Sequence, residues 1–254
     1  MKRLLIIFIG CLMFAACKKE SLQQYTEKSR VYLSLRRDSL YSKFPLSTAG
    51  NLIIDYAPQK STKQKDTLRL RIQISGSAAN SDRAFVFERN ASIGTAKEGT
   101  DFDLLDKSFL MPAGKFNTIV RVVVYRNPNM AKQPVTFAYN VKANENFELG
   151  PDRDTIGFTN NSAVMNMVAL RVTAKDILVK PDNWESYIKT YFGVYSEVKH
   201  RFVIDITGLV NFPAATYPVG RMNTFRNTLR TALTKYNTEH PEKLKDENGI
   251  EISF

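Results

Sequence analysis

The sequence predicts a mainly β protein, an antiparallel β-sandwich followed by a smaller helix-containing α+β region. Apolar and polar residues alternate in short segments as far as about Thr173, for example from Leu68 to Ile74, where Arg69 and Arg71 fall between apolar positions. This period of two indicates strands with one buried and one solvated face. Turn-forming residues separate the segments without an intervening helical pattern, which is typical of a sandwich. Beyond Thr173, apolar residues recur at spacings of three and four, as in amphipathic helices.

The strands are expected in the order in which the alternation appears along the chain. The first carries Val31, Leu33 and Leu35 on one face. The others are expected near Leu52 to Tyr56, Leu68 to Ile74, Phe85 to Glu88, Thr118 to Tyr125, Val135 to Val141 and Val164 to Val172. Pieces such as Ala79-Asn80-Ser81-Asp82 and Asn127-Pro128-Asn129 supply the turns. We therefore assign residues 27–175 to the sandwich.

The remaining region, residues 176–254, is expected to contain helices. Asp182 follows Pro181 and is expected to cap a helix that enters at Trp184. A second helix is indicated by one apolar stripe, formed by Met222, Phe225, Leu229, Leu233 and Tyr236. His240-Pro241 ends this helix, because proline cannot continue it. The boundary between the two regions is placed near Lys175 to Lys180.

The N-terminus has the pattern of a lipoprotein signal peptide, residues 1–16. Lys2 and Arg3 form a basic start, Leu4 to Phe14 is apolar, and two small residues precede Cys17. An apolar run of about a dozen residues is too short for a lasting transmembrane helix, which needs about 20. Cys11 is the alternative cleavage point, but it would leave an apolar stretch of only about five residues, below the usual minimum. We therefore expect lipid on Cys17 and a polar tether over residues 17–26.

Lipidation predicts where the protein resides and what its cysteines can do. Cys11 and Cys17 are the only cysteines, so after cleavage the single remaining thiol would be acylated. A disulfide, a thiolate nucleophile and a cysteine metal site are then not expected. The expected location is the outer membrane, on the cell surface or the periplasmic face, with the membrane as partner through the lipid.

The excess of basic residues does not indicate a nucleic-acid partner. The formal net charge of the chain is +11, and removal of Lys2 and Arg3 leaves +9. A nucleic-acid binder usually concentrates such charge in a stripe or on one helix, whereas these basic residues are scattered along the chain. We interpret them as a solvated surface, with anionic headgroups or acidic ligands as the alternatives.

The motifs of common enzymes are not found in the sequence. The two histidines, His200 and His240, lie in no metal-ligand spacing. The stretch from Gly94 to Gly99 lacks the glycine spacing of a phosphate-binding loop, and no nucleophile elbow appears. We therefore expect a protein that is not an enzyme and carries no cofactor or metal.

An acidic loop is the first of two candidate ligand-binding features. It contains Glu98, Asp101, Asp103 and Asp106. Such clusters are usually turn caps and solvated loop edges, which is the interpretation we favour. Calcium binding is the alternative, because carboxylates on one loop supply hard oxygen ligands.

A cluster of aromatic residues is the second candidate. It consists of Trp184, Tyr187, Tyr191, Phe192 and Tyr195. Aromatic residues at helical spacing usually belong to a core. A stacking platform for sugar rings is the alternative interpretation.

The region around the acidic loop resembles the Calx-beta type of immunoglobulin-like sandwich found in sodium-calcium exchangers. The resemblance rests on Thr95 to Phe102, on Phe109 to Lys115 and on the strand Thr118 to Tyr125. In that pattern the glycine makes a turn, the Asp-aromatic pair starts a strand, and a second small turn joins two strands of a sheet. The acidic positions that bind calcium in that family are not matched here, so the resemblance implies the fold alone.

Most of the chain after residue 17 resembles a family of Bacteroidetes lipoproteins known as domain of unknown function 4843. The shared features, in chain order, are Ser81-Asp82-Arg83, Ala96-Lys97-Glu98-Gly99, Ala143-Asn144-Glu145-Asn146-Phe147, Trp184 with Tyr191 to Ser196 and Lys199, and Asp246-Glu247-Asn248-Gly249. The resemblance implies an accessory of a SusC/SusD-like nutrient-uptake locus. It assigns no catalytic residues and leaves the ligand-binding residues unknown.

Three classes of function follow from these observations. The favoured one is a non-enzymatic envelope lipoprotein that binds a nutrient or docks on a SusC/SusD-like importer. A structural or adhesive envelope module is the second, and it is favoured if the aromatic cluster is core and the acidic loop is only a turn. A hydrolase is the third, and it would need two carboxylates that converge in a cleft.

Overall fold

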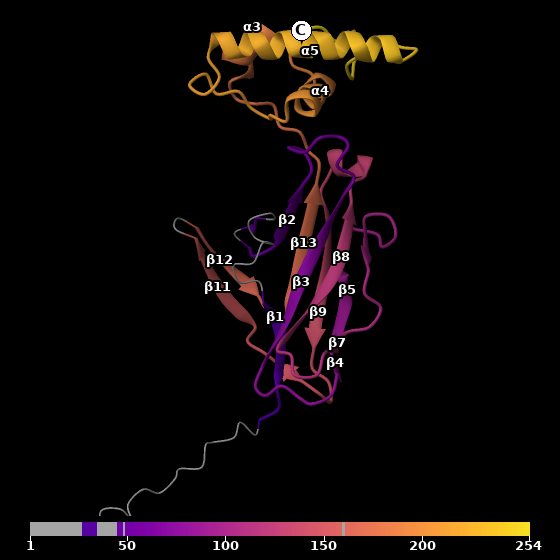
Figure 1. The fold of residues 1–254 in the computed structure, drawn as a ribbon, viewed down its shortest axis with the longest axis vertical. Coiled ribbons are helices and arrows are strands. Elements are labelled where there is room, and N and C mark those ends of the chain that lie inside the picture. Colours follow the sequence, from indigo (N-terminus) through magenta and orange to yellow (C-terminus); the bar gives the residue numbers. More distant parts are fainter. Residues whose placement is uncertain (1–26, 35–44, 48, 159–160) are drawn as a thin grey trace, which may run out of the picture.

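The computed structural model describes residues 27–34, 45–47, 49–158 and 161–254. The predicted signal peptide, the tether and Cys17 lie outside these residues, as does Leu35 of the first predicted strand. Within the described part, the protein is a β-sandwich with a helical layer at one end (Figure 1). The mainly β fold with a helix-containing C-terminal region is thus confirmed.

Two sheets form the sandwich. The five-stranded sheet has the order β10-β1-β3-β8-β6, and the four-stranded sheet has the order β2-β13-β9-β5. The strands of the first are β1 (Arg30–Ser34), β3 (Lys65–Ser75), β6 (Phe102–Leu104), β8 (Asn117–Tyr125) and β10 (Glu148–Leu149). Those of the second are β2 (Leu52–Asp55), β5 (Val86–Gly94), β9 (Val135–Lys142) and β13 (Ala169–Lys175). Two small pairs complete the strands: β4 (Arg83–Ala84) with β7 (Leu110–Met111), and β11 (Arg153–Phe158) with β12 (Asn161–Asn166).

Alternation of residues along β3 explains why the sheets pack face to face. Leu68, Leu70 and Ile72 are fully buried, whereas Arg69 between them is exposed. Because successive side chains of a strand point to opposite faces, all three leucine and isoleucine side chains enter the core together. The four-stranded sheet supplies matching residues such as Phe137, so one contiguous apolar cluster joins the two sheets. Burial of this cluster is the main source of the sandwich's stability.

The strand pairing differs from the predicted antiparallel pattern in two places. β1 pairs in parallel with β10, and β13 pairs in parallel with β2. The single strand predicted from Val164 to Val172 was also wrong, because this stretch contains the end of β12 and the start of β13. Asn166 causes the break: its side-chain oxygen accepts hydrogen bonds from the backbone N–H groups of Val168 and Ala169, at 2.9 and 2.8 Å. Such a turn redirects the chain between two strands.

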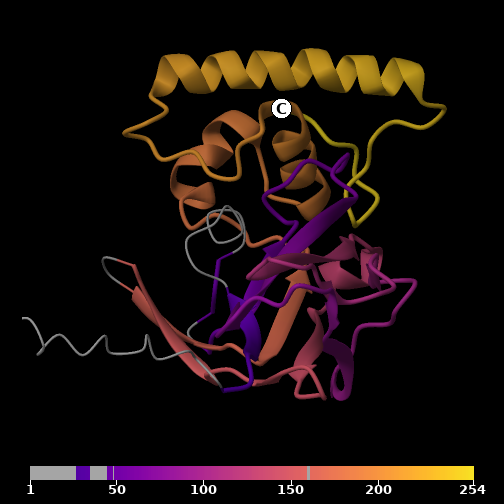
Figure 2. The same ribbon diagram turned by 60° about the horizontal axis from the view of Figure 1, so that its bottom comes forward.

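Helices cover one end of the sandwich. They are a turn of π-helix, η2 (Trp184–Ile188), followed by α3 (Lys189–Phe192), α4 (Glu197–Thr207) and the long α5 (Val219–Glu239). A short 3₁₀ turn, η1 (Pro128–Ala131), lies within the sandwich region. Figure 2 shows α5 outermost, with α3 and α4 between it and the strands. In the part of the chain that the structure describes, no helix is both long and apolar enough to cross a membrane.

The helical stripe on α5 was predicted well, but the first helix was not. Met222 and Leu229 are fully buried and Leu233 is 8% exposed, as the stripe requires, and α5 ends before His240. The prediction that Asp182 caps the first helix was wrong. Asn183 occupies the N-cap position, but its Oδ1 accepts no capping bond; its amide nitrogen donates to the Phe212 carbonyl at 2.9 Å.

An ion-pair network joins the helical layer to the sandwich. Asp176, the residue after β13, binds Arg126 at 2.7 Å and Arg201 of α4 at 2.7 Å. Asp205 of α4 accepts hydrogen bonds from the backbone and hydroxyl of Ser61, at 2.5 and 2.6 Å. The helical residues also have their own apolar cluster around Trp184. The boundary between the two regions near Lys175 to Lys180 stays a prediction.

Candidate functional site

The acidic loop uses its carboxylates to hold the backbone of the sandwich. The two carboxylate oxygens of Asp101 accept hydrogen bonds from the Lys97 N–H, at 2.7 Å, and from the Asn127 amide. Asp103 accepts a hydrogen bond from the Gly99 N–H at 3.0 Å and another from the Tyr125 hydroxyl at 3.0 Å. These are the turn-capping roles that the favoured interpretation of the loop predicts.

Asp106 is also occupied within the protein. It binds the Arg121 guanidinium at 2.6 Å and accepts a hydrogen bond from the Arg121 backbone N–H. These contacts lower the pKa of Asp106, chiefly through the side-chain hydrogen bond from Arg121. Across the described residues, no three histidine, cysteine, aspartate or glutamate side chains gather as a metal ion would require. The loop therefore gives calcium binding no geometric support.

The aromatic cluster is core and not a binding platform. Trp184 and Phe192 are fully buried and Tyr191 is 9% exposed. The indole N–H of Trp184 donates to the Gly193 carbonyl at 3.1 Å, and its ring meets those of Tyr195 and His200 edge to face. A buried indole with a satisfied N–H is a packing element. The burial agrees with the favoured interpretation of these residues as core and gives the sugar-stacking alternative no support.

Several residues that carry the family resemblance also support the fold. Asp82 accepts a hydrogen bond from the Ala113 N–H at 2.8 Å, and the Arg83 guanidinium lies 4.5 Å from the centre of the Phe147 ring. Glu247 accepts hydrogen bonds from the backbone N–H groups at the start of α4, at 3.1 and 3.4 Å. The motif Asp246-Glu247-Asn248-Gly249 is therefore a turn that caps this helix, since a carboxylate there stabilises the N-terminal dipole.

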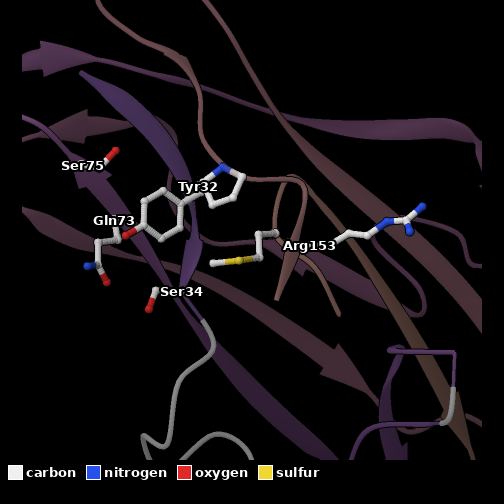
Figure 3. Close-up of a pocket in the computed structure, with 7 residues that line it drawn as sticks. Tyr32, Ser34, Gln73, Ser75 and Arg153 are labelled. Carbon is white, nitrogen blue, oxygen red and sulfur yellow. The ribbon is translucent and has the colours of Figure 1, made fainter. Parts of the chain in front are cut away.

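A groove on the outer face of the five-stranded sheet is the best candidate for a binding site (Figure 3). It has a volume of about 340 Å³. Its lining residues come from β1, from β3, from the start of β11 and from the chain on either side of the β11–β12 hairpin: Tyr32, Ser34, Gln73, Ser75, Arg153, Pro151 and Met167. Volumes of about 300–1,000 Å³ are typical of small-molecule sites. We refer to these seven residues below as the outer-face groove.

The strand register explains how the floor of the groove forms. Tyr32 of β1 lies opposite Gln73 of β3, and Arg30 lies opposite Ser75. Since their neighbours Val31, Leu33, Ile72 and Ile74 face the core, the side chains of the floor face outward. The pairing of β1 with β3 thereby brings an aromatic ring and several polar groups to one surface, although the two strands lie about 40 positions apart in the chain.

One wall of the groove is built by the chain that leads into the β11–β12 hairpin. The Gly150 N–H donates to the Val31 carbonyl at 3.0 Å, and the Leu33 N–H donates to the Met167 carbonyl at 2.7 Å. A Cβ atom on Gly150 would lie only 2.7 Å from Cδ1 of Tyr32, so a glycine is needed where the backbone crosses this ring. The wall therefore fixes the position of Tyr32.

Three neutral side chains of the groove have hydrogen-bonding capacity that the fold does not use. Within the described part of the protein, the Ser34 hydroxyl, the Gln73 amide and the Ser75 hydroxyl have no side-chain hydrogen bond. Ser34 as a whole residue is 8% exposed. Polar groups held in a concave surface without internal partners are the usual means by which a site orients its ligand.

Charge in the groove is sparse. Arg153 is its one charged lining residue, and Figure 3 shows its guanidinium extending away from the other side chains. Arg153 lies 3.9 Å from Asp152, and both side chains are more than three-quarters exposed. The lining contains no carboxylate, so the pair of converging acids that hydrolysis of a glycoside requires is not found in this groove. The geometry suits binding of a polar, uncharged molecule.

The groove was not predicted from the sequence. Ser34, Gln73 and Ser75 look like ordinary residues on the solvated face of two strands. Only the register of β1 against β3, together with the return of the chain at Gly150, places them around one hollow. The sole sequence signal was the glycine before Pro151 that ends β10.

Comparison with models of protein families gives a match. The family model described as Domain of unknown function (DUF4843) matches residues 25–209, which is well over half of the chain. The match includes the whole sandwich, η2, α3 and α4, and it stops before α5. A search of curated proteins finds no match.

Proposed function

The chain belongs to the family described as Domain of unknown function (DUF4843), and from this premise we propose that it is a non-enzymatic envelope lipoprotein. It binds a nutrient in the outer-face groove as an accessory of a SusC/SusD-like importer in the outer membrane of a Bacteroidetes bacterium. The observation that carries the binding role is the set of unused polar groups in the groove. The sequence resemblance supports the importer as the partner.

The N-terminal sequence supports the lipid anchor. A basic start, an apolar run and two small residues precede Cys17 in the order that lipoprotein signals share. The chain enters β1 at the end of the sandwich opposite the helical layer (Figure 1). Ten tether residues span at most about 36 Å when fully extended. A protein anchored through Cys17 would thus hold the β1 end of the sandwich within about this distance of the membrane.

The Calx-beta-like assignment of the sandwich is part of the proposal. It is supported by Gly99, whose φ of 81° suits a tight turn, and by β6, which begins at Phe102 directly after Asp101. The turn containing Gly114, with φ of 68°, joins β7 to β8. These are the turns and strand starts that the resemblance implies.

A structural or adhesive envelope module is the second candidate. Two observations favour it: the aromatic cluster is core, and the acidic loop consists of turn caps. The acidic loop and the aromatic cluster, which were the two candidate ligand-binding features of the sequence, therefore make their contacts within the protein. The binding proposal now depends on the outer-face groove, which makes the two candidates separable by experiment.

Lipidation is tested by metabolic labelling with a palmitate analogue. The wild-type chain should be labelled and should fractionate with outer-membrane material, whereas Cys17→Ala should lose the label. Cys11→Ala is the matched control and should keep it. Unchanged labelling of Cys17→Ala would refute the anchor.

Docking is tested by affinity purification from membranes in mild detergent. We expect a TonB-dependent porin of the SusC class to copurify with the tagged wild-type chain. Recovery of the chain alone, together with no binding to glycan and peptide arrays, would leave the structural module as the function.

A further inference from the structure

We infer that the outer-face groove binds a neutral, polyhydroxylated ligand, a sugar ring, with Gln73, Ser34 and Ser75 as its hydrogen-bonding partners and Tyr32 as its apolar surface. This inference rests on the proposed binding function and specifies the ligand class. Two arguments support it. The chemistry of the lining residues matches a sugar, and the groove does not suit three other classes of ligand.

An extended peptide added as a new strand does not fit. Strand addition requires free backbone N–H and carbonyl groups along the outer edge of β1. That edge is already occupied, because the Val31 carbonyl accepts a hydrogen bond from Gly150 and the Leu33 N–H donates to Met167. The pairing of β1 with β10 at Arg30 and Val31 closes the rest of the described edge.

Charged ligands do not fit either. A cationic ligand would need a carboxylate, and the lining has none. An anionic ligand would need a cation directed into the groove. Arg153 extends away from the floor and lies beside Asp152, which offsets its charge in solvent (Figure 3).

A purely apolar ligand is disfavoured by the floor itself. It would cover the Ser34 hydroxyl, the Gln73 amide and the Ser75 hydroxyl without replacing the hydrogen bonds that these groups make to water. Each buried polar group left unsatisfied lowers affinity. Apolar surface is nevertheless available in the groove, because its lining also includes the Tyr32 ring, Pro151 and Met167.

A sugar ring matches this combination. Its hydroxyls both donate and accept hydrogen bonds, as do the serine hydroxyls and the glutamine amide. Gln73 and Ser75 lie two residues apart on one face of β3, and Gln73 lies opposite Tyr32. A ligand that fills the groove must therefore present polar groups at several points of its rim and an apolar face to the aromatic ring, which a pyranose does.

The test uses the full-length lipoprotein in a detergent without a sugar headgroup, because a glycoside detergent would compete for the site. The protein is applied to an array that carries neutral oligosaccharides, oligouronides and short peptides. The strongest neutral sugar is then titrated calorimetrically against the wild type, Gln73→Leu, Ser75→Ala and Thr67→Val. Thr67 lies on the same face of β3 but outside the groove, so Thr67→Val is the matched control.

We expect binding to neutral oligosaccharides, with the affinity reduced about tenfold in Gln73→Leu, as loss of its hydrogen bonds implies. Ser75→Ala should weaken binding less, and Thr67→Val should leave it unchanged. Equal melting temperatures of the variants would exclude unfolding as the cause. Neutral-sugar binding that is unaffected by both groove variants would overturn the inference.

Two other outcomes separate the inference from the proposed function. Selective binding of oligouronides or peptides that Gln73→Leu weakens would overturn the sugar assignment and leave the binding function in place. No binding to any class on the array would overturn the inference and the binding role together, and only docking on the importer, tested by copurification, would remain.

Discussion

Arg201 of α4 and Asp176 after β13 lie 2.7 Å apart, and this ion pair ties the helical layer to the sandwich. Asp176 also binds Arg126, whose side chain is 8% exposed. Arg201 extends the contact by donating to the backbone carbonyls of Ala57 and Gln59, at 3.0 and 2.9 Å. The carboxylate of Asp176 therefore pairs with two arginine side chains at the junction between the helical layer and the sandwich.

Removing this carboxylate should destabilise the whole chain. Asp176→Ala leaves the guanidinium of Arg126 buried without its partner, and loss of one member of a buried ion pair costs about 3–5 kcal/mol. We expect a free energy of unfolding reduced by about 3 kcal/mol in urea denaturation. Glu185→Ala, which removes the exposed pairs with Lys180 and Lys189, is the control and should change the free energy of unfolding much less than Asp176→Ala does. Similar losses in the two variants would contradict the role of Asp176.

The buried stripe of α5 gives a second prediction. Leu229 is fully buried, so Leu229→Asp would place an unpaired charge in the helical core, at a cost of several kcal/mol. Its neighbour Thr228 is exposed, and Thr228→Asp should be tolerated. Thermal melting of both variants checks this. A Leu229→Asp chain that melts like the wild type would show that the helix face is misassigned.

His200 makes the stability of the helical layer depend on pH. Its side chain is fully buried, Nε2 lies 2.9 Å from the Val210 carbonyl oxygen, and Nδ1 has no hydrogen-bond partner among the described residues. Burial is the main cause of its lowered pKa, and the nearby Arg201 lowers it further. The folded state therefore binds a proton on this ring less readily than the unfolded state does.

Because the unfolded state binds more protons, stability should fall as the pH drops below about 6.5. Urea denaturation at pH 5 and pH 7.5 measures this difference. In His200→Gln the difference should shrink, because the buried ring is then absent from the folded state. A wild-type chain that gains stability on acidification would contradict the prediction.

The turn at Glu247 gives a further prediction. Its carboxylate accepts hydrogen bonds from the Glu197 and Val198 N–H groups, while the Ser196 hydroxyl accepts one from Lys199 at 3.1 Å. Glu247→Ala should cost about 1 kcal/mol, as the loss of a helix cap does. Glu242→Ala, which changes an exposed carboxylate away from any helix start, should be neutral in the same denaturation series. An equal loss of stability in Glu247→Ala and Glu242→Ala would exclude the capping role of Glu247.

Strands were predictable from the sequence wherever one face is buried and the other is solvated. The alternation from Leu68 to Ile74 fixed both the strand and the face of each residue, and the register of β3 agrees with it. It failed at Val164 to Val172, because the apolar residues continue through a turn that depends on the side chain of Asn166.

Helix α4 and the groove were missed for different reasons. The signals for α4 exist locally: Ser196 caps its start, and Gly208, with φ of 73°, ends it. They were missed because the prediction for this stretch rested on the aromatic residues from Trp184 onward, which indicated a single helix. Apart from Gly150, the groove has no local signal, since it forms only when β1, β3 and the chain near Gly150 are brought together by pairing.

The measurement that tests the anchored arrangement most directly is energy transfer from the protein to acceptor lipids in membrane vesicles. An acylated Cys17 leaves no thiol in the processed chain, so Ser77→Cys and Thr231→Cys can each be labelled at one site. Ser77 lies beside Ser29 at the entry to β1, and Thr231 is exposed on the distant α5. The account predicts clearly stronger transfer from position 77, and its loss at both positions with Cys17→Ala. Equal transfer from both positions, or transfer that survives Cys17→Ala, would contradict it.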